Sequence, residues 1–220
     1  MNVLIFGATG MVGQGVLREC LLDAGVQLVQ TIGRSATGVQ HAKLREVLHR
    51  DLFDYSSVAT ELSGFDACFF CLGVSSVGMP ETDYERVTYG ITLAAAGTLS
   101  RLNPQMTFVY VSGAGTDSSE QGRVRWARVK GRTENALLRL PFKAAYMFRP
   151  GVIQPLHAIK AKTPVYRIFY TLAKPLLTAL RWAFPAHILT TEQIGRAMLA
   201  VARHGAPKRV LESKDISAIA

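Results

Sequence analysis

The feature that most constrains the fold of this chain is a glycine-rich segment close to its N-terminus. The segment Gly7-Ala8-Thr9-Gly10-Met11-Val12-Gly13 directly follows a short apolar run, Asn2–Phe6, and opens a stretch of helical periodicity. In such a strand–loop–helix unit the first glycine permits a tight turn, the second lets the backbone approach a pyrophosphate, and the third lets the helix pack closely on the strand. The helix N-terminus offers free N–H groups to the phosphates. A glycine-rich turn without a ligand would not require this spacing, so the segment predicts a dinucleotide-binding loop.

The rest of the chain alternates between strand-like and helix-like segments. Further strands are expected at 27–32, 46–49, 66–72, 106–112 and 144–148, and helices at 11–24, 55–62, 84–102 and 123–139. Apolar strands that alternate with helices are typical of a buried parallel sheet, and right-handed crossovers place helices on both of its faces. The pattern predicts an α/β fold, a doubly wound Rossmann fold with a central parallel sheet and a small C-terminal helical lid.

All 220 residues are expected to form one nucleotide-binding domain, because this length suits a single α/β unit and no linker or repeat interrupts it. The character changes at residue 152, after which two helical segments and at most one short strand, near 209–212, are expected. We expect 152–220 to fold over the carboxyl ends of the strands as a substrate-side lid. Its closing helix, 190–202, should begin with Thr190 or Thr191 as N-cap and carry Glu192-Gln193 in its first turn.

The end of the second expected strand, Thr31-Ile32-Gly33-Arg34-Ser35, bears on the choice between the two nicotinamide dinucleotides. An acidic residue there would bind the ribose 2′-hydroxyl of NAD, whereas an arginine can pair with the 2′-phosphate of NADP. Arg34 and Ser35 therefore favour NADP(H), with a solvated loop arginine as the alternative. Asp51-Leu52, after the third strand, lies where a side chain could meet the adenine amino group. A turn or cap residue is an equally good interpretation of Asp51.

Composition and charge exclude several other classes of protein. Hydrophobic residues make up 49% and charged residues 19%, which is typical of a globular chain, and the net charge of +9 is dispersed. No stretch combines basic charge with aromatic side chains suited to base stacking, so no nucleic-acid partner is expected. We find neither a secretory signal nor a run of about 18 apolar residues. The expected location is therefore the cytoplasm.

The three cysteines are expected to be buried thiols. Cys68 and Cys71 form a C-x-x-C pair, but residues three apart on a strand point to opposite faces and cannot share a metal ion. Cys20 makes the count odd, which argues against a disulfide framework. The histidines show no ligand spacing, so no metal site is expected.

The segment 165–184 combines aromatic and aliphatic residues with Arg167, Lys174 and Arg181, whose seven-residue spacing places them on one helical stripe. Pro175 should break or kink this segment. Three interpretations stay open: a helix pair packed over the pocket, a basic amphipathic element that docks on an anionic membrane surface, and a homo-oligomer interface.

Further motifs complete a pattern that resembles the short-chain dehydrogenase/reductase superfamily, and within it the atypical branch of NmrA-like, Tat-interacting-protein-like and NAD-dependent epimerase-like proteins. Besides the glycine loop, the motifs are Gly33-Arg34, Asp51-Leu52, Cys71-Leu72-Gly73, Val111-Ser112-Gly113-Ala114, Trp126-Ala127-Arg128-Val129-Lys130-Gly131 and Phe148-Arg149-Pro150-Gly151. They extend over nearly the whole chain. The resemblance implies a Rossmann fold, an NAD(P) cofactor and a small-molecule substrate.

The resemblance also implies roles for individual residues. Ser112 matches the active-site serine, and Lys130 matches the lysine that hydrogen-bonds the nicotinamide ribose, so these two are the expected catalytic residues. Leu72 and Gly73 would lie beside the cofactor, and residues 150–152 would border the nicotinamide. The expected cofactor-binding residues are Gly7, Thr9, Gly10, Met11, Val12, Gly13, Arg34, Ser35, Asp51, Leu52, Leu72, Gly73, Lys130, Pro150 and Val152.

Trp126 is the departure from the family pattern. The resemblance implies a tyrosine, the usual proton donor, four residues before Lys130, and an indole N–H donates hydrogen bonds but does not titrate. Ser112, a water held by Lys130, or a tyrosine such as Tyr84 or Tyr89 could replace that acid. Two hypotheses follow. The first is an NADP(H)-dependent oxidoreductase or epimerase-like enzyme for a small carbonyl or hydroxyl compound. The second is a non-catalytic NADP(H)-binding module that reports redox state to a protein or membrane partner.

Overall fold

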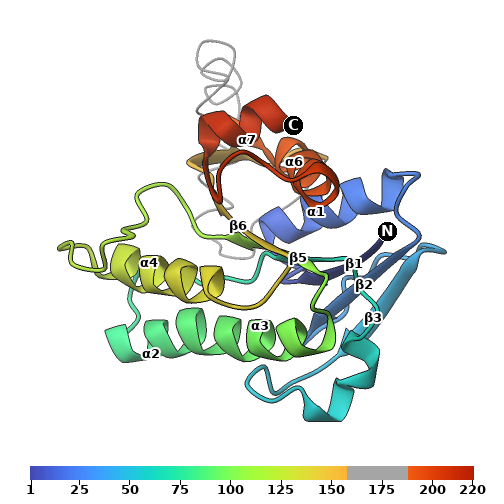
Figure 1. Ribbon diagram of the computed structural model, residues 1–220, viewed down its shortest axis with the longest axis horizontal. Helices are drawn as coiled ribbons and strands as arrows, with labels where there is room; N and C mark the ends of the chain where they lie inside the picture. The colour runs from blue at the N-terminus through green and yellow to red at the C-terminus, as the bar shows by residue number, and fades with distance from the viewer. Residues whose placement is uncertain (158–187) are drawn as a thin grey trace.

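The computed structural model of the chain describes residues 1–157 and 188–220, so the basic segment at 165–184 lies outside the described residues (Figure 1). Its centre is a seven-stranded sheet in the order β3-β2-β1-β4-β5-β6-β9, in which every pair of neighbours is parallel. The strands are β1 (Asn2–Phe6), β2 (Leu28–Gly33), β3 (Leu44–Leu48), β4 (Ala67–Phe70), β5 (Thr107–Val111), β6 (Ala144–Arg149) and β9 (Val210–Glu212). A second, two-stranded sheet pairs β7 (Val152–Gln154) with β8 (Ile188–Thr190).

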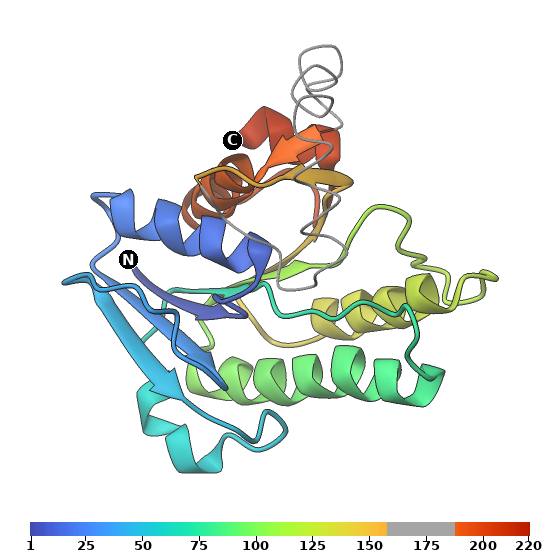
Figure 2. The ribbon, with the colours of Figure 1, turned by 180° about the vertical axis from the view of Figure 1, so that it is seen from behind.

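Helices cover both faces of the main sheet, which confirms the predicted doubly wound Rossmann fold (Figures 1 and 2). One face carries α1 and α6, and the other carries α3 and α4. The helices are α1 (Met11–Leu22), α2 (Glu81–Glu85), α3 (Ile91–Leu102), α4 (Arg125–Leu138), α6 (Thr191–His204) and α7 (Ser213–Ile219). A π-helical turn, Arg86–Gly90, joins α2 directly to α3.

The apolar run of β1 shows why a chain with this sequence forms a sheet buried on both sides. Alternate residues of a strand point to opposite faces, so Val3 and Ile5 pack under α1 and α6, whereas Leu4 and Phe6 pack toward α3. All four side chains are fully buried. Cys68 and Cys71 likewise contact opposite core layers, as predicted.

Helices α1 and α6 pack closely because glycines lie on both sides of their contact. A Cβ on Gly15 would lie 2.5 Å from Cβ of Thr191, and a Cβ on Gly195 would lie 2.8 Å from Cγ of Glu19. The described C-terminal residues are thus part of the main sandwich, since α6 packs on α1 and β9 completes the sheet. Thr190 is the N-cap of α6 and forms a capping box with Gln193, as expected.

Some predicted elements differ from the structure. Residues 55–62 form two 3₁₀ turns, Ser56–Val58 and Thr60–Leu62, because serine and threonine there compete for backbone hydrogen bonds and favour turns over a helix. The prediction of at most one strand after residue 152 is wrong, since β7, β8 and β9 are all present. Each has only three residues, which is too short for a recognisable hydrophobic period. The described helices include none that is long and apolar enough to cross a bilayer.

Candidate functional site

The glycine loop sits at the point where the strand order reverses. Strand β1 pairs with both β2 and β4, so the carboxyl end of β1 opens into the crevice where doubly wound folds bind ligands. Gly7 adopts a φ of +75°, and a Cβ there would lie 2.6 Å from the backbone nitrogen of Leu72. A Cβ on Gly13 would lie 2.1 Å from the carbonyl oxygen of Gly7. The fold itself therefore requires glycine at these two positions.

Gly10 differs from its two neighbours in the motif. Its φ of −81° is open to any residue, and a Cβ there would meet only the carbonyl oxygen of Gly7, at 3.3 Å. No side chain caps the N-terminus of α1, which begins at Met11. Packing therefore demands glycine much less strongly at this position than at Gly7 and Gly13, whereas a pyrophosphate that approaches the backbone at the helix N-terminus would demand it. Thr9, Met11 and Val12 are half-buried beside it.

The carboxyl ends of β2 and β3 present the residues expected to choose between NAD and NADP. Arg34 and Ser35 are exposed directly after β2, and Arg34 makes no ion pair with any described residue. Asp51 accepts a hydrogen bond from the backbone N–H of Phe53 at 2.9 Å, which is the turn role considered as its alternative. Leu52 is buried in the core under this turn. The carboxylate of Asp51 remains exposed while it makes that turn.

Ser112 and Lys130 meet at the carboxyl end of β5, as expected. The ammonium of Lys130 donates a hydrogen bond to the backbone carbonyl of Ser112. The hydroxyl of Ser112 is buried and donates to Oε1 of Glu134 at 2.5 Å, with the carbonyl oxygen of Phe148 3.1 Å away. Burial lowers the pKa of Lys130 to about 8, although Glu134 acts in the opposite direction. Ser112 is therefore oriented by α4, and its proton is directed to a carboxylate.

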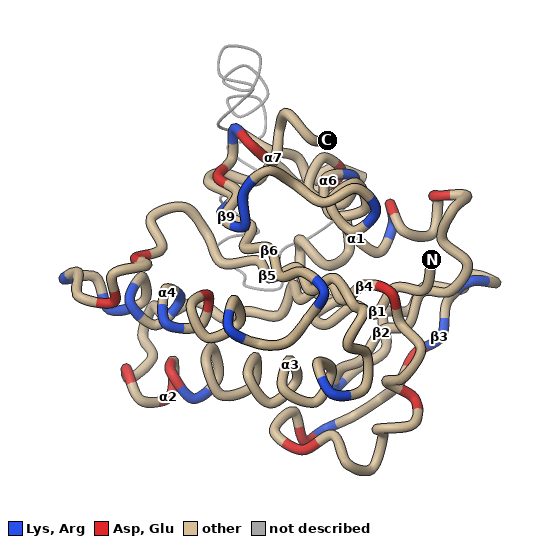
Figure 3. The backbone as a smooth tube through the Cα atoms, in the orientation of Figure 1, with Lys and Arg blue, Asp and Glu red and all other residues tan. Residues whose placement is uncertain are grey.

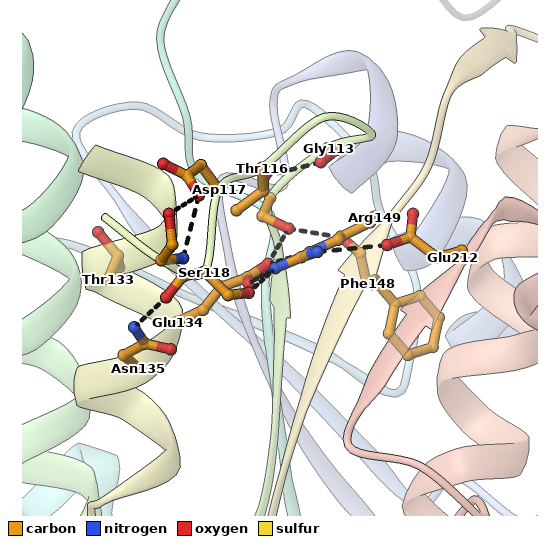
Figure 4. A network of polar contacts seen from close by, with 12 residues as sticks. Gly113, Thr116, Asp117, Ser118, Thr133, Glu134, Asn135, Phe148, Arg149 and Glu212 are labelled. Atoms are coloured by element: carbon orange, nitrogen blue, oxygen red, sulfur yellow. Dashed lines mark hydrogen bonds and ion pairs between the residues drawn. The ribbon is translucent and has the colours of Figure 1, made fainter. Parts of the chain in front are cut away.

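Glu134 forms the centre of a buried polar network that sequence reasoning did not identify (Figure 4). Its carboxylate forms an ion pair with Arg149, whose Nε donates to Oε1 at 3.0 Å. Arg149 also reaches Oγ of Ser118 at 2.5 Å and Oε1 of Glu212 at 3.3 Å. The network joins α4, the loop after β5, and the ends of β6 and β9. The sequence does show a glutamate one helical turn after Lys130. That spacing suggests an ion pair with Lys130, whereas in the structure Glu134 pairs with Arg149.

Trp126 is half-buried and walls the same end of the sheet. Its indole ring lies 3.5 Å from where a Cβ on Gly115 would be, so it packs on the loop that follows β5. The two tyrosines considered as replacements for the missing acid are engaged elsewhere. Tyr84 is buried, which raises its pKa, and the ring of Tyr89 stacks under the guanidinium of Arg132 at 4.4 Å.

The segment after β6 closes the other side of this edge. The carbonyl oxygen of Pro150 accepts a hydrogen bond from the backbone N–H of Ala114 at 2.9 Å, which fixes the two loops together. Pro150 is buried and Val152, the first residue of β7, is half-exposed. Leu72 and Gly73, which follow β4, are half-buried and exposed respectively at the same edge. The structure thus gathers the expected residues along the carboxyl ends of β1 to β6.

Comparison with models of protein families identifies the family to which the chain is related. The profile of the NAD dependent epimerase/dehydratase family matches residues 3–124, which is more than half of the chain. The chain belongs to this family. The resemblance to epimerase-like, atypical short-chain dehydrogenase/reductase proteins is thereby confirmed.

Curated relatives of this family member come from fungi. Protein FMP52-2, mitochondrial, of Scheffersomyces stipitis is 28% identical over 155 residues, covering 69% of this chain and 66% of the relative. Protein fmp52, mitochondrial, of Emericella nidulans is 26% identical over 159 residues, with the same coverage. The chain therefore spans slightly less than two thirds of these relatives' length. Because these relatives are named as mitochondrial proteins, the expectation of a cytoplasmic location is wrong.

Solved structures show the same fold at low sequence identity. The Bordetella bronchiseptica enzyme WbmF, in complex with NAD⁺, has a TM-score of 0.69 and 15% identity, covering 99% of this chain and 76% of that protein. UDP-glucuronic acid 4-epimerase of Bacillus cereus, in complex with NAD, has a TM-score of 0.67 and 12% identity, covering 96% of this chain and 76% of that protein. An oxidoreductase of the short-chain dehydrogenase/reductase family from Burkholderia thailandensis has a TM-score of 0.70 and 16% identity, with 97% and 91% coverage.

The different demands on Gly10 and Gly13 give a matched pair of variants. Gly13→Ala should lower the free energy of unfolding by about 1–3 kcal/mol, because its Cβ would overlap the Gly7 backbone. Gly10→Ala should cost about 1 kcal/mol or less in stability. It should nevertheless weaken dinucleotide binding by about tenfold or more, which corresponds to about 1.4 kcal/mol. Urea unfolding and calorimetric titration measure the two effects. Full-strength binding by Gly10→Ala would contradict a phosphate role for this position.

The buried network gives a second pair of variants. Glu134→Gln should lower the free energy of unfolding by about 3–5 kcal/mol, because it removes the buried carboxylate of the Arg149 ion pair and leaves only the half-exposed Glu212 as a counter-charge. Glu85→Gln removes a comparable helix-borne carboxylate that pairs with Arg132 at the surface, and it should cost about 0–1 kcal/mol. Urea unfolding of both variants checks the difference. Equal losses would show that the Glu134–Arg149 pair contributes no more than a surface pair.

Proposed function

We propose that this chain binds NADP(H) and acts as an oxidoreductase on a small carbonyl or hydroxyl compound. The observation that carries the proposal is Gly10, the glycine of the loop that packing demands least, at a helix N-terminus without a side-chain cap in the crevice beside β1. Family membership supports it, because the family profile covers this part of the chain. The solved structures of WbmF and of the Bacillus cereus epimerase, which share this fold, are complexes with NAD, and this supports a nicotinamide dinucleotide as the ligand.

The residues that would hold a nicotinamide dinucleotide lie along the carboxyl edge of the main sheet. The backbone of the glycine loop and the N-terminus of α1 would hold the pyrophosphate. Asp51 and Leu72 would border the adenine side, and Lys130 would bind the nicotinamide ribose. Pro150 and Val152 would lie beside the nicotinamide ring, which supplies or accepts a hydride when the cofactor is bound.

The preference for NADP(H) rests on the end of β2. The family pattern for NAD places an acidic residue there, and this chain has Arg34 and Ser35 instead. Arg34 is exposed and makes no ion pair with any described residue, so its guanidinium is available to a 2′-phosphate. A guanidinium can bind a phosphate through two parallel hydrogen bonds, which adds both energy and orientation.

A second candidate function is a non-catalytic module that binds NADP(H) and reports redox state to a partner. The specific observation in its favour is Trp126, which stands where the family pattern has its proton-donating tyrosine. The hydroxyl of Ser112 donates to Glu134 and is thus withheld from a substrate. Lys130 favours the enzyme, since its ammonium reaches the carboxyl end of β5 and forms no ion pair with a carboxylate of the described residues, an environment that suits an amine to proton transfer.

Calorimetric titration of the purified protein with NADPH and with NADH at equal salt tests the proposal. We expect NADPH to bind more tightly. Arg34→Ser should remove about 1.5–3 kcal/mol of that preference, or about ten- to a hundredfold in Kd, because one charge-assisted contact is lost. Arg139→Ser, an exposed arginine at the C-terminal end of α4, is the control and should bind as the wild type does.

The outcomes separate the two parts of the proposal. Preference for NADH would refute the role of Arg34 and leave the dinucleotide site intact. Failure to bind either dinucleotide would refute the cofactor proposal as a whole.

A further inference from the structure

The proposed oxidoreductase needs a proton donor at the substrate oxygen, and the residue that the family pattern places there is a tryptophan. On the basis of the proposed function, we infer that the ammonium of Lys130 donates this proton directly. Lys130 is one helical turn after Trp126 on α4, so both side chains lie on the same face of the helix. The Lys130 ammonium reaches the carboxyl end of β5, where it donates to the Ser112 carbonyl.

The other candidate acids among the described residues are engaged in structural contacts. The Ser112 hydroxyl is buried and gives its hydrogen to Glu134 at 2.5 Å. Both carboxylate oxygens of Glu134 accept hydrogen bonds from the Arg149 guanidinium, and Oε1 also accepts one from Ser112, so this side chain is fully engaged inside the protein. Neither residue therefore replaces the missing tyrosine.

The nearby tyrosines are also unsuited to the role. Tyr84 and Tyr110 are buried, and burial raises the pKa of both phenols. Tyr89 is stacked against Arg132, on the side of α4 that faces the helical turn at 86–90. Cys71, directly after β4, is a thiol whose pKa is raised to about 12 by burial.

Among the residues that the structure describes, no carboxylate forms an ion pair with Lys130, because Arg149 engages Glu134. Glu134 lies one turn after Lys130 and would be its natural ion-pair partner, but its carboxylate is turned to Arg149 on β6. Asp117, in the loop that packs on α4, has its carboxylate bonded to Ser119 and to the backbone N–H of Gly122. The desolvated ammonium of Lys130 thus keeps only partial compensation from Glu134, and its pKa falls to about 8. It is mostly protonated at neutral pH and releases its proton more readily than an ordinary lysine.

In the inferred step, the carbonyl carbon of the substrate gains a hydride from the reduced nicotinamide, and the π electrons of the C=O bond move to the oxygen. The oxygen then takes the proton from Nζ of Lys130, which is left as a neutral amine and regains a proton from water. Reduction therefore requires protonated Lys130, so its rate should fall as pH rises through about 8. An ordinary lysine would remain protonated to about pH 10.4.

Two measurements on the full chain test the inference. The first is independent of turnover: the titration of Lys130 followed by NMR after ¹³C reductive methylation, with the Lys130 signal assigned by its loss in Lys130→Arg. We expect a midpoint near 8 in the wild type. In Arg149→Gln the freed Glu134 should shift the midpoint to higher pH. A midpoint near 10.4 in the wild type overturns the inference.

The second measurement follows NADPH oxidation with benzaldehyde and with hexanal as probes. Arginine keeps the positive charge of lysine but does not titrate, so Lys130→Arg removes the proton donor, and rates are compared at NADPH concentrations that saturate each variant. Its reductase rate should fall by about a hundredfold or more, the usual contribution of a general acid. Adding Trp126→Tyr to Lys130→Arg should restore at least about tenfold of the lost rate, because the phenol supplies the absent acid.

The possible results distinguish this inference from the proposed function on which it rests. Wild-type rates in Lys130→Arg, or an unchanged pH midpoint of activity in that variant, overturn the donor role of Lys130 while the oxidoreductase stands. A double variant that is no faster than Lys130→Arg also speaks against it. If the wild type binds NADPH and reduces neither aldehyde, the oxidoreductase proposal fails and the inference fails with it.

Discussion

The buried ion pair between Glu134 and Arg149 is the contact on which the arrangement of the site depends. Neither group can be left alone in the core, since an unpaired buried charge costs several kcal/mol. The pair fixes α4 to the end of β6, and through Ser118 and Glu212 it also fixes the loop after β5 and the end of β9. Because α4 carries Trp126 and Lys130, their positions at the carboxyl edge follow from this one interaction. The buried network of Glu134 and Arg149 thus supports the edge of the sheet that would meet a substrate.

The same edge shows how packing demands and ligand demands can be separated within one short motif. Gly7 and Gly13 are needed because a side chain at either position would overlap backbone, that of residues 71–72 after β4 for Gly7 and that of the loop itself for Gly13. Packing constrains Gly10 less, and its position at a helix N-terminus without a side-chain cap is the part of the motif that points to a ligand. The sequence pattern predicts these three roles from position alone. The contacts that a Cβ would make at each position agree with that division.

Much of the fold was predictable, because it is encoded in local and periodic signals. The runs that became β1, β5 and β6 are apolar and bounded by turns, and the glycine loop fixed the topology around them. The three-residue strands β7, β8 and β9 were not all predictable, since their pairing depends on contacts between distant segments. The site followed the same division: Ser112 and Lys130 were expected to meet, and they do. The pairing of Glu134 with Arg149 was not predictable, because it depends on how close α4 and β6 lie in the folded chain, and no local sequence pattern determines that distance.

The replacement of tyrosine by Trp126 acquires a physical meaning only in this tertiary context. A lysine that served a neighbouring phenol would do so as a permanent cation, and a nearby carboxylate would then be an advantage because it holds the charge. Here Arg149 occupies that carboxylate, so the amine is desolvated with only partial compensation. The absence of the phenol and the pairing of Glu134 with Arg149 thus favour the same role for Lys130, because both leave its ammonium as the group that can donate a proton at this edge. Trp126 packs on the loop at Gly115 from the same helical face as Lys130, so the place of the phenol is taken by a side chain that has no acidic proton to compete with the amine.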